Sequence, residues 1–163
     1  MRSLHVLSPG LLTTVQDLGR TRWRHLGVAH TGALDADAVR LANRLAGNGA
    51  GAAALEMTLR GPTLRFDAPA RIAMIGASVV ARFEGERVPC GRPVDLPAGT
   101  LELGSLRGGA RAGLAIDGGI DVVPVLASVT NAARLDRTFE AYRPDCVFHA
   151  TAYKHVPMLE ANM

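Results

Sequence analysis

The stretch that decides the fold is LDADAVRLANRLAGNGAGAAALEMTL, residues 34–59, because the spacing of its apolar residues changes midway. In the first half they recur at three and four positions, which places them on one face of a helix; they are Leu34, Ala38, Leu41, Ala42 and Leu45. After Gly51 the period becomes two, which is typical of a half-buried strand. The stretch therefore predicts one major helix near residues 34–46, followed by a strand.

Both ends of the predicted helix carry residues that favour the start or the end of a helix. Asp35 and Asp37 lie near its start, where the helix dipole favours negative charge, and Gly47 suits the position after its end. The glycine-rich residues 47–51 resemble a phosphate loop, but a dinucleotide-binding loop follows a strand and opens a helix. We interpret them as a connection in which Asn48 is a turn residue.

Short apolar segments broken by glycine and proline lie on both sides of this helix. They cover residues 5–7, 11–15, 55–59, 63–66, 71–75, 78–83, 93–96, 100–103 and 112–116. The glycines of residues 104–113 and the pair Gly118-Gly119 are interpreted as β-turns between them. The pattern predicts an α+β fold that is mainly antiparallel β, a meander or a barrel, with one major helix.

The character of the sequence changes near residues 127–129. Residues 132–142 have helical spacing with Asn131 as a plausible N-cap, and residues 146–150 form a short apolar run. A helix followed by a buried strand is typical of an α/β sheet, and nothing earlier in the chain supplies partner strands. We predict a helix–strand appendage after the β-rich part.

Composition excludes several classes of protein. The net charge is +3, but the basic residues are interleaved with acids, and only Arg20, Arg22 and Arg24 are close together, which argues against nucleic-acid binding. No apolar run approaches the roughly 18 residues of a membrane span. The apolar run near the N-terminus is too short for a signal peptide. We therefore expect a cytoplasmic protein with Cys90 and Cys146 reduced.

One group of polar residues could form a binding site. Gln16, Asp17 and Arg20 lie together at the start of a glycine-bearing loop, residues 17–32. An amide, a carboxylate and a guanidinium could hold a small carboxylate- or urea-like substrate, with two parallel hydrogen bonds from the arginine. The alternative is structural, with Asp17 and Arg20 pairing to stiffen the loop.

Other candidates are weaker. Asn43 on the helix could reach a cleft, face solvent or pack against a neighbour. Glu56 alternates with apolar residues, which predicts an outward-facing carboxylate, and a general-base role stays open although no second carboxylate lies nearby in sequence. His25 and His30 lack a third ligand, so no metal site is expected.

Residues 3–128 resemble a known family. The similarity lies in residues 8–20, 25–28, 32–35, 41–43, 55–56, 61–66 and 118–121, which agree in order with the N-terminal half of the family of the 5-oxoprolinase C subunit, also called allophanate hydrolase subunit 2 or biotin-dependent carboxyltransferase. The resemblance implies a partial cyclophilin-like barrel. It also implies a hydrolase that opens 5-oxoproline to glutamate with ATP, or a carboxyltransferase that acts on urea.

The same resemblance implies partners. Members work beside a sister subunit, so ATP or biotin is expected only through partner subunits, and some members are non-catalytic binding modules that act on a kinase-inhibitor-like partner. Gln16, Asp17 and Arg20 fall in the most distinctive stretch, and with Asn43 and Glu56 they are the substrate-binding candidates. Because family members are longer than this stretch, we expect a truncated subunit that is inactive alone.

Residues 129–163 resemble a different family. The segment PDCVFHATAYKHVP, residues 144–157, is similar to an internal segment of the nucleotide-sugar dehydratases of polysaccharide biosynthesis, which are extended short-chain dehydrogenases. Ala150, Lys154 and His155 match residues of the dehydratase cleft, but the glycine fingerprint is absent, so no nicotinamide cofactor is expected. The chain is thus interpreted as a chimera of domains 1–128 and 129–163, and a non-functional chimera is a further alternative.

Overall fold

The computed structural model describes residues 4–20, 22, 24–27, 29–120 and 131–143. The chain divides into two compact units, Met1–Leu126 and Ala127–Met163. The predicted strand at residues 146–150, the remnant residues Ala150, Lys154 and His155, and the expected join at residues 127–129 all lie outside the described residues.

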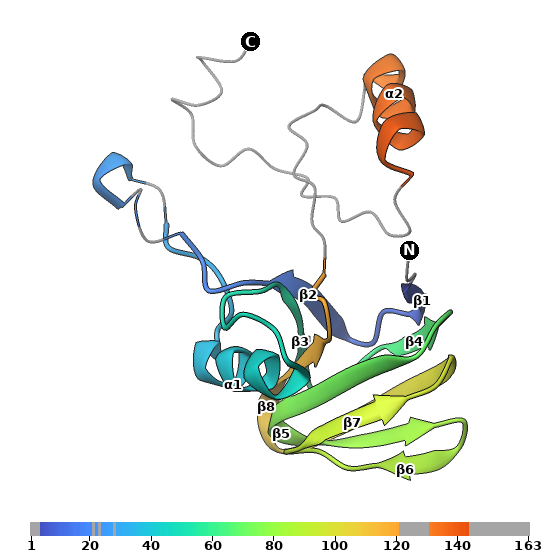
Figure 1. The fold of residues 1–163 in the computed structure, drawn as a ribbon. Helices are drawn as coiled ribbons and strands as arrows, with labels where there is room; N and C mark the ends of the chain where they lie inside the picture. The colour runs from blue at the N-terminus through green and yellow to red at the C-terminus, as the bar shows by residue number, and fades with distance from the viewer. Residues whose placement is uncertain (1–3, 21, 23, 28, 121–130, 144–163) are drawn as a thin grey trace. The chain divides into compact units, whose positions relative to one another are not determined.

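The first unit is built on an antiparallel sheet of eight strands (Figure 1). Its strands are β1 (Leu4–Ser8), β2 (Leu12–Gln16), β3 (Ala54–Thr58), β4 (Thr63–Phe66), β5 (Ala70–Phe83), β6 (Glu86–Val88), β7 (Pro93–Leu96) and β8 (Gly99–Ile116). Every strand pair in it is antiparallel. The predicted fold class is therefore confirmed.

The long strand β8 organises this sheet. On one side its first part pairs with β4 (Gly99 with Phe66) and its last part with β3 (Leu114 with Leu55). On the other side it runs along β5, with register shifts after Gly76 and Val79. Such irregularities bend strands and increase their twist. The sheet consequently curls into a half-barrel around an apolar core, in which Met57, Leu64, Ile72, Leu101 and Leu114 are fully buried.

The helix α1 (Ala36–Ala46) packs on the opposite face of the sheet from this core, over β5 and β8. Val39, Ala42 and Ala46 form its buried face, together with small residues of the strands below. Gly113 of β8 lies directly under it: a Cβ there would come within 3.3 Å of the Val39 Cγ2 atom. Small residues on both sides therefore allow the helix backbone to approach the sheet closely.

The ends of α1 lie where the sequence predicts them, but two of the leucines predicted for its apolar face are exposed. Asp35 is the N-cap, with its side chain accepting from the Ala38 N–H at 3.0 Å, and Gly47 ends the helix with φ of +91°. Leu34 precedes the helix and is 74% exposed, and Leu41 is 47% exposed. The apolar spacing was correct, but alanines form most of the contact.

Two strand predictions were wrong in instructive ways. β3 is not half-buried, because four consecutive residues, Ala54 to Met57, are buried with the core on one face and the α1 region on the other. The glycines of residues 104–113 do not form turns; they lie inside β8, just as the predicted strands 71–75 and 78–83 are one strand. Gly118 and Gly119, with φ of +82° and +74°, do form a turn.

The described part of the second unit is the helix α2 (Ala132–Tyr142), as predicted. The Asn131 side chain caps it by accepting from the Arg134 N–H at 3.1 Å. None of its residues is buried. Neither α1 nor α2, the α-helices of the described ranges, has the length and apolar character needed to cross a membrane.

Candidate substrate-binding site

The loop that joins β2 to α1 is fixed at its base by backbone contacts. The Arg20 N–H donates to the His30 carbonyl at 2.7 Å, and the Ala33 N–H donates to the Asp17 carbonyl at 2.9 Å. Gly19 and Gly32 meet where the outgoing and returning segments touch: a Cβ on Gly32 would lie 2.6 Å from the Gly19 nitrogen. Both have positive φ, so glycine is required at this close approach.

The side chains of Gln16, Asp17 and Arg20 have separate local partners. Gln16 Nε2 donates to Thr14 Oγ1 at 3.2 Å, and Asp17 Oδ1 accepts from the Gly19 N–H at 2.7 Å. Arg20 Nη2 donates to Thr31 Oγ1 at 3.2 Å. Asp17 and Arg20 therefore stiffen the loop through different bonds, and no ion pair joins these two described residues.

Glu56 is buried, which corrects the prediction of an outward-facing carboxylate; its side chain is 3% exposed. Its Oε1 accepts from the backbone N–H of Asp35 at 2.9 Å, and its Oε2 lies 3.6 Å from Arg111 Nη1. The Arg111 guanidinium also donates to Thr58 Oγ1 at 2.9 Å. A buried carboxylate needs such partners to offset the free energy of its desolvation. Glu56 thus attaches the start of α1 to the sheet.

Strand register places Gln16 near this carboxylate. Thr14 of β2 pairs with Glu56 of β3, so their side chains share one face of the sheet, and Gln16 lies two residues along on the same face. Arg111 of β8 pairs with Thr58 in the same manner. We call this group the β2–α1 cluster; it consists of Thr14, Gln16, Asp35, Glu56, Thr58 and Arg111, and the loop with Asp17 and Arg20 begins at its edge.

Asn43 is not part of the cluster. It is fully buried in the last turns of α1, donates to the Ala52 carbonyl at 2.7 Å and accepts from Asn48 Nδ2 at 3.0 Å. Asn48 in turn binds the Ile116 carbonyl and the Gly118 N–H. Of the three roles considered for Asn43, the structure therefore shows packing, and Asn48 is a turn residue that ties two loops together.

Sequence reasoning missed Arg111 and Asp35 as members of the cluster. Arg111 is the charged residue in the run Gly-Gly-Ala-Arg-Ala-Gly-Leu of β8, residues 108–114. An isolated cation among small residues indicates a partner across the sheet, but nothing in the sequence identifies that partner as Glu56, whose alternation with Leu55 and Met57 is also that of an exposed side chain.

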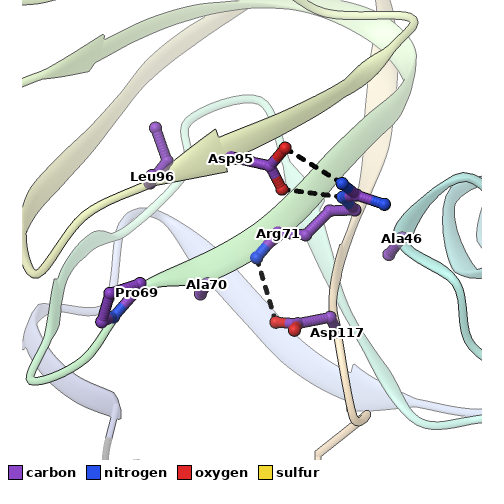
Figure 2. Close-up of a pocket in the computed structure, with 7 residues that line it drawn as sticks. All are labelled: Ala46, Pro69, Ala70, Arg71, Asp95, Leu96 and Asp117. Carbon is purple, nitrogen blue, oxygen red and sulfur yellow. Dashed lines mark hydrogen bonds and ion pairs between the residues drawn. The ribbon is translucent and has the colours of Figure 1, made fainter.

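A separate hollow of about 290 Å³ lies near the other end of α1 (Figure 2). It is lined by Ala46, Pro69, Ala70, Arg71, Asp95, Leu96 and Asp117. Arg71 donates twice to the Asp95 carboxylate, at 2.7 and 3.0 Å, which raises the pKa of Arg71 and lowers that of Asp95. Both side chains lie opposite each other on paired strands, so this ion pair joins β5 to β7. None of the predicted site residues that the structure describes is among those that line the hollow.

The histidines and the cysteine of the described ranges do not form a second candidate site. Within the described ranges no three His, Cys, Asp or Glu side chains come together in a way that could hold a metal ion. Cys90 is a free thiol whose Sγ lies 3.4 Å from the Val79 carbonyl. Among the described residues, the groups best suited to bind a small polar ligand lie in the β2–α1 cluster and the loop beside it.

Comparison with known proteins gives two different matches. The family model described as "Carboxyltransferase domain, subdomain A and B" matches residues 26–137. The model described as "Polysaccharide biosynthesis protein" matches residues 114–163. The two ranges overlap at residues 114–137, and the first begins after Gln16, Asp17 and Arg20.

The individual relatives fall into the same two groups of proteins. The chain is 44% identical to the 5-oxoprolinase C subunit of Escherichia coli (strain K12) over 126 residues, covering 77% of this chain and 41% of that protein. It is 39% identical to Urea amidolyase of Saccharomyces cerevisiae over 128 residues, covering 77% of this chain and 7% of the relative. A stretch of 43 residues is 44% identical to Capsular polysaccharide biosynthesis protein CapD of Staphylococcus aureus, covering 26% of this chain and 7% of that protein.

Solved structures agree with the longer match. The crystal structure of the Kluyveromyces lactis Urea Carboxylase superposes with a TM-score of 0.72 at 40% identity, covering 76% of this chain and 11% of that chain. The chain thus spans less than half the length of each of these relatives.

Proposed function

Since this chain belongs to the family of the carboxyltransferase domain, subdomain A and B, we propose that it supplies part of a subunit that acts on 5-oxoproline or urea. The names of the relatives, a 5-oxoprolinase subunit and Urea amidolyase, support these two substrates. Both substrates carry an amide group, and 5-oxoproline adds a carboxylate. The β2–α1 loop offers groups that complement both.

In this proposal Arg20 binds the carboxylate. Its side chain is exposed and directs one nitrogen, Nη2, to Thr31 Oγ1, while a guanidinium has five N–H donors in a fixed fork. The remaining donors suit a carboxylate in a bidentate arrangement. The fixed base of the loop, with its Gly19–Gly32 contact, holds the Arg20 backbone in place. This placement of Arg20 is the observation that carries the proposal.

Gln16 supplies the complementary amide. Its Nε2 donates to Thr14, and its side-chain carbonyl is an acceptor for the N–H of a lactam or of urea. Glu56 is too deeply buried to touch a ligand on this surface, so we assign it a positioning role: it holds Asp35, and with it the returning end of the loop. Asp17 stabilises the loop through Gly19.

Turnover is proposed to require partner subunits. The word "subunit" in the name of the Escherichia coli relative and the much greater length of the urea amidolyase support this. ATP or biotin chemistry would then be supplied by partners, while this chain contributes the binding surface. Residues 114–163, which match the polysaccharide biosynthesis family, favour a second candidate: a chimera in which the C-terminal part adds no activity and binds no nicotinamide cofactor.

Calorimetry on the purified chain tests the substrate assignment. We expect binding of 5-oxoproline and of urea. Arg20→Ala should lower the affinity for 5-oxoproline by about tenfold to a hundredfold, because a charged hydrogen-bonded contact is lost. Urea has no carboxylate, so the same variant should leave urea binding within about threefold. Gln16→Ala should lower the affinity for both ligands. Arg87→Ala, at an exposed position in β6, is the matched control.

Several results would contradict parts of the proposal. Equal weakening of both ligands by Arg20→Ala would contradict the carboxylate assignment. Hydrolysis of ATP with 5-oxoproline by the chain alone would contradict the need for partners, and micromolar binding of NAD would contradict the inert C-terminal part. A stable complex with a 5-oxoprolinase sister subunit that binds no substrate would favour a non-catalytic binding module.

A further inference from the structure

The outer part of the β2–α1 loop forms an arm that leaves the sheet after β2 and returns to it before α1 (Figure 1). We call the described residues of this arm, 18–20, 22, 24–27 and 29–32, the cationic arm. Its outer end carries the short 3-10 helix η1 (Arg24–Leu26), which has no buried residue. Every described residue between Arg22 and Thr31 is exposed. The described residues at this end of the arm therefore contribute no side chain to the core of the domain.

The charge of the arm has one sign. Residues 18–32 contain three arginines, two histidines and no aspartate or glutamate, whereas basic and acidic residues are interleaved in the rest of the chain. The bond from Arg20 to Thr31 holds one of these cations at the base. The side chains of Arg22, Arg24 and His25 have no partner among the described residues. Unpaired cations on an exposed segment attract a partner of opposite charge.

An apolar residue lies among these cations. Leu26 in η1 is 62% exposed. Arginine, as at Arg22 and Arg24, is among the residue types that most often dominate the binding energy of protein interfaces. A leucine beside unpaired arginines matches an apolar pocket with a charged rim, the usual anatomy of such an interface.

We propose that the cationic arm is a docking element for a protein partner whose surface presents carboxylates around an apolar pocket. Leu26 would enter the pocket, and Arg22, Arg24 and His25 would face the carboxylates. A protein surface fits better than a nucleic acid, because phosphate backbones are bound by a longer stripe of cations and gain little from an inserted leucine at an exposed tip. Arg22, Arg24, His25 and Leu26 are separate from Gln16 and Arg20, the residues proposed to bind a small substrate.

Fluorescence anisotropy with the full chain tests the proposal. The probe is a short labelled peptide with glutamates on both sides of a leucine–phenylalanine pair, and a peptide with glutamines in place of the glutamates is its neutral counterpart. We expect the acidic peptide to bind and its affinity to fall as salt is raised. The double variant Arg22→Glu/Arg24→Glu should weaken binding by about tenfold or more. Leu26→Ser should weaken it by about threefold to tenfold with no change in salt dependence.

The matched control is Arg87→Glu/Arg92→Glu, which changes the net charge equally at two exposed arginines whose side chains have no partner among the described residues. It should alter peptide binding by less than about threefold. Equal weakening by the two double variants would show attraction by net charge alone and would overturn the proposal. So would failure of the acidic peptide to bind at low salt, or tighter binding of single-stranded DNA than of the peptide. Circular dichroism of each variant verifies that it is folded.

Discussion

Replacing Glu56 gives the sharpest test of how the β2–α1 cluster is held together. The carboxylate is 3% exposed, accepts from the Asp35 N–H and lies 3.6 Å from Arg111. Glu56→Ala removes a charged acceptor, whose hydrogen bond is worth about 1.5–3 kcal/mol, and leaves the Asp35 N–H without its partner. Removing one partner of a fully buried pair costs about 3–5 kcal/mol, but Arg111 is 33% exposed and can regain water. We therefore expect a loss of about 3 kcal/mol in unfolding free energy.

Glu56→Gln separates the hydrogen bond from the charge. The amide oxygen can still accept from Asp35, so only the attraction to Arg111 is lost, and we expect a loss of about 1 kcal/mol. In a double-mutant cycle, Arg111→Met should cost much less in the Glu56→Gln background than in the wild-type chain. Glu86→Gln, an exposed glutamate in β6, is the control and should be neutral within about 0.5 kcal/mol.

The assay is urea denaturation followed by circular dichroism, with thermal unfolding as a second measurement. A loss of about 3 kcal/mol should lower the midpoint by roughly 10 °C in a domain of this size. If Glu56→Gln and Glu86→Gln had the same effect, the attraction between Glu56 and Arg111 would be negligible. If Glu56→Ala were neutral, the attachment of α1 through Asp35 would be refuted.

Three further predictions concern other parts of the chain. Gly113→Ala should cost about 1–3 kcal/mol because a Cβ meets the helix above it, whereas Gly49→Ala, in open space, should be neutral in chemical denaturation. Arg71 lowers the pKa of Asp95, so this pair stabilises the fold above the ordinary aspartate pKa and its contribution is lost as pH falls through the lowered value; stability measured against pH for Asp95→Asn should lack that loss. Deleting residues 129–163 should leave the thermal midpoint nearly unchanged, since segments from two families have no co-adapted surfaces, and a fall of more than about 10 °C would contradict this.

Local signals in the sequence predicted the helices and the β-rich character well. The spacing before Ala46 and the positions of Asp35 and Gly47 fixed α1, because capping and helix periodicity depend on residues that are close in sequence. Asn131 fixed the start of α2 in the same manner. Each of these features involves neighbours within about one helical turn, so no knowledge of the tertiary fold was needed.

Features that depend on a second layer could not be predicted. Glu56 alternates with Leu55 and Met57 as an outward-facing residue would, and only the start of α1 folding over that face makes it buried. The glycines of β8 likewise look like turn residues, because sequence does not reveal that Gly113 fits under a helix and that Gly104 lies against the Val80 carbonyl. In both cases the reason lies in residues far away along the chain.

The central position of β8 also determines when the domain can form. Among the described strands, β1 pairs with β4, β2 pairs with β3, and β5 pairs with β6 and β7, and only β8 joins these three groups into one sheet. On the ribosome, the strand edges that pair with β8 therefore stay unpaired until residues 99–116 have been made, and the synthesis of these residues takes about 1–4 s. Until then the nascent chain exposes β3, β4 and β5 as unpaired apolar edges, which makes this interval the time of greatest risk of aggregation and of greatest use for a chaperone.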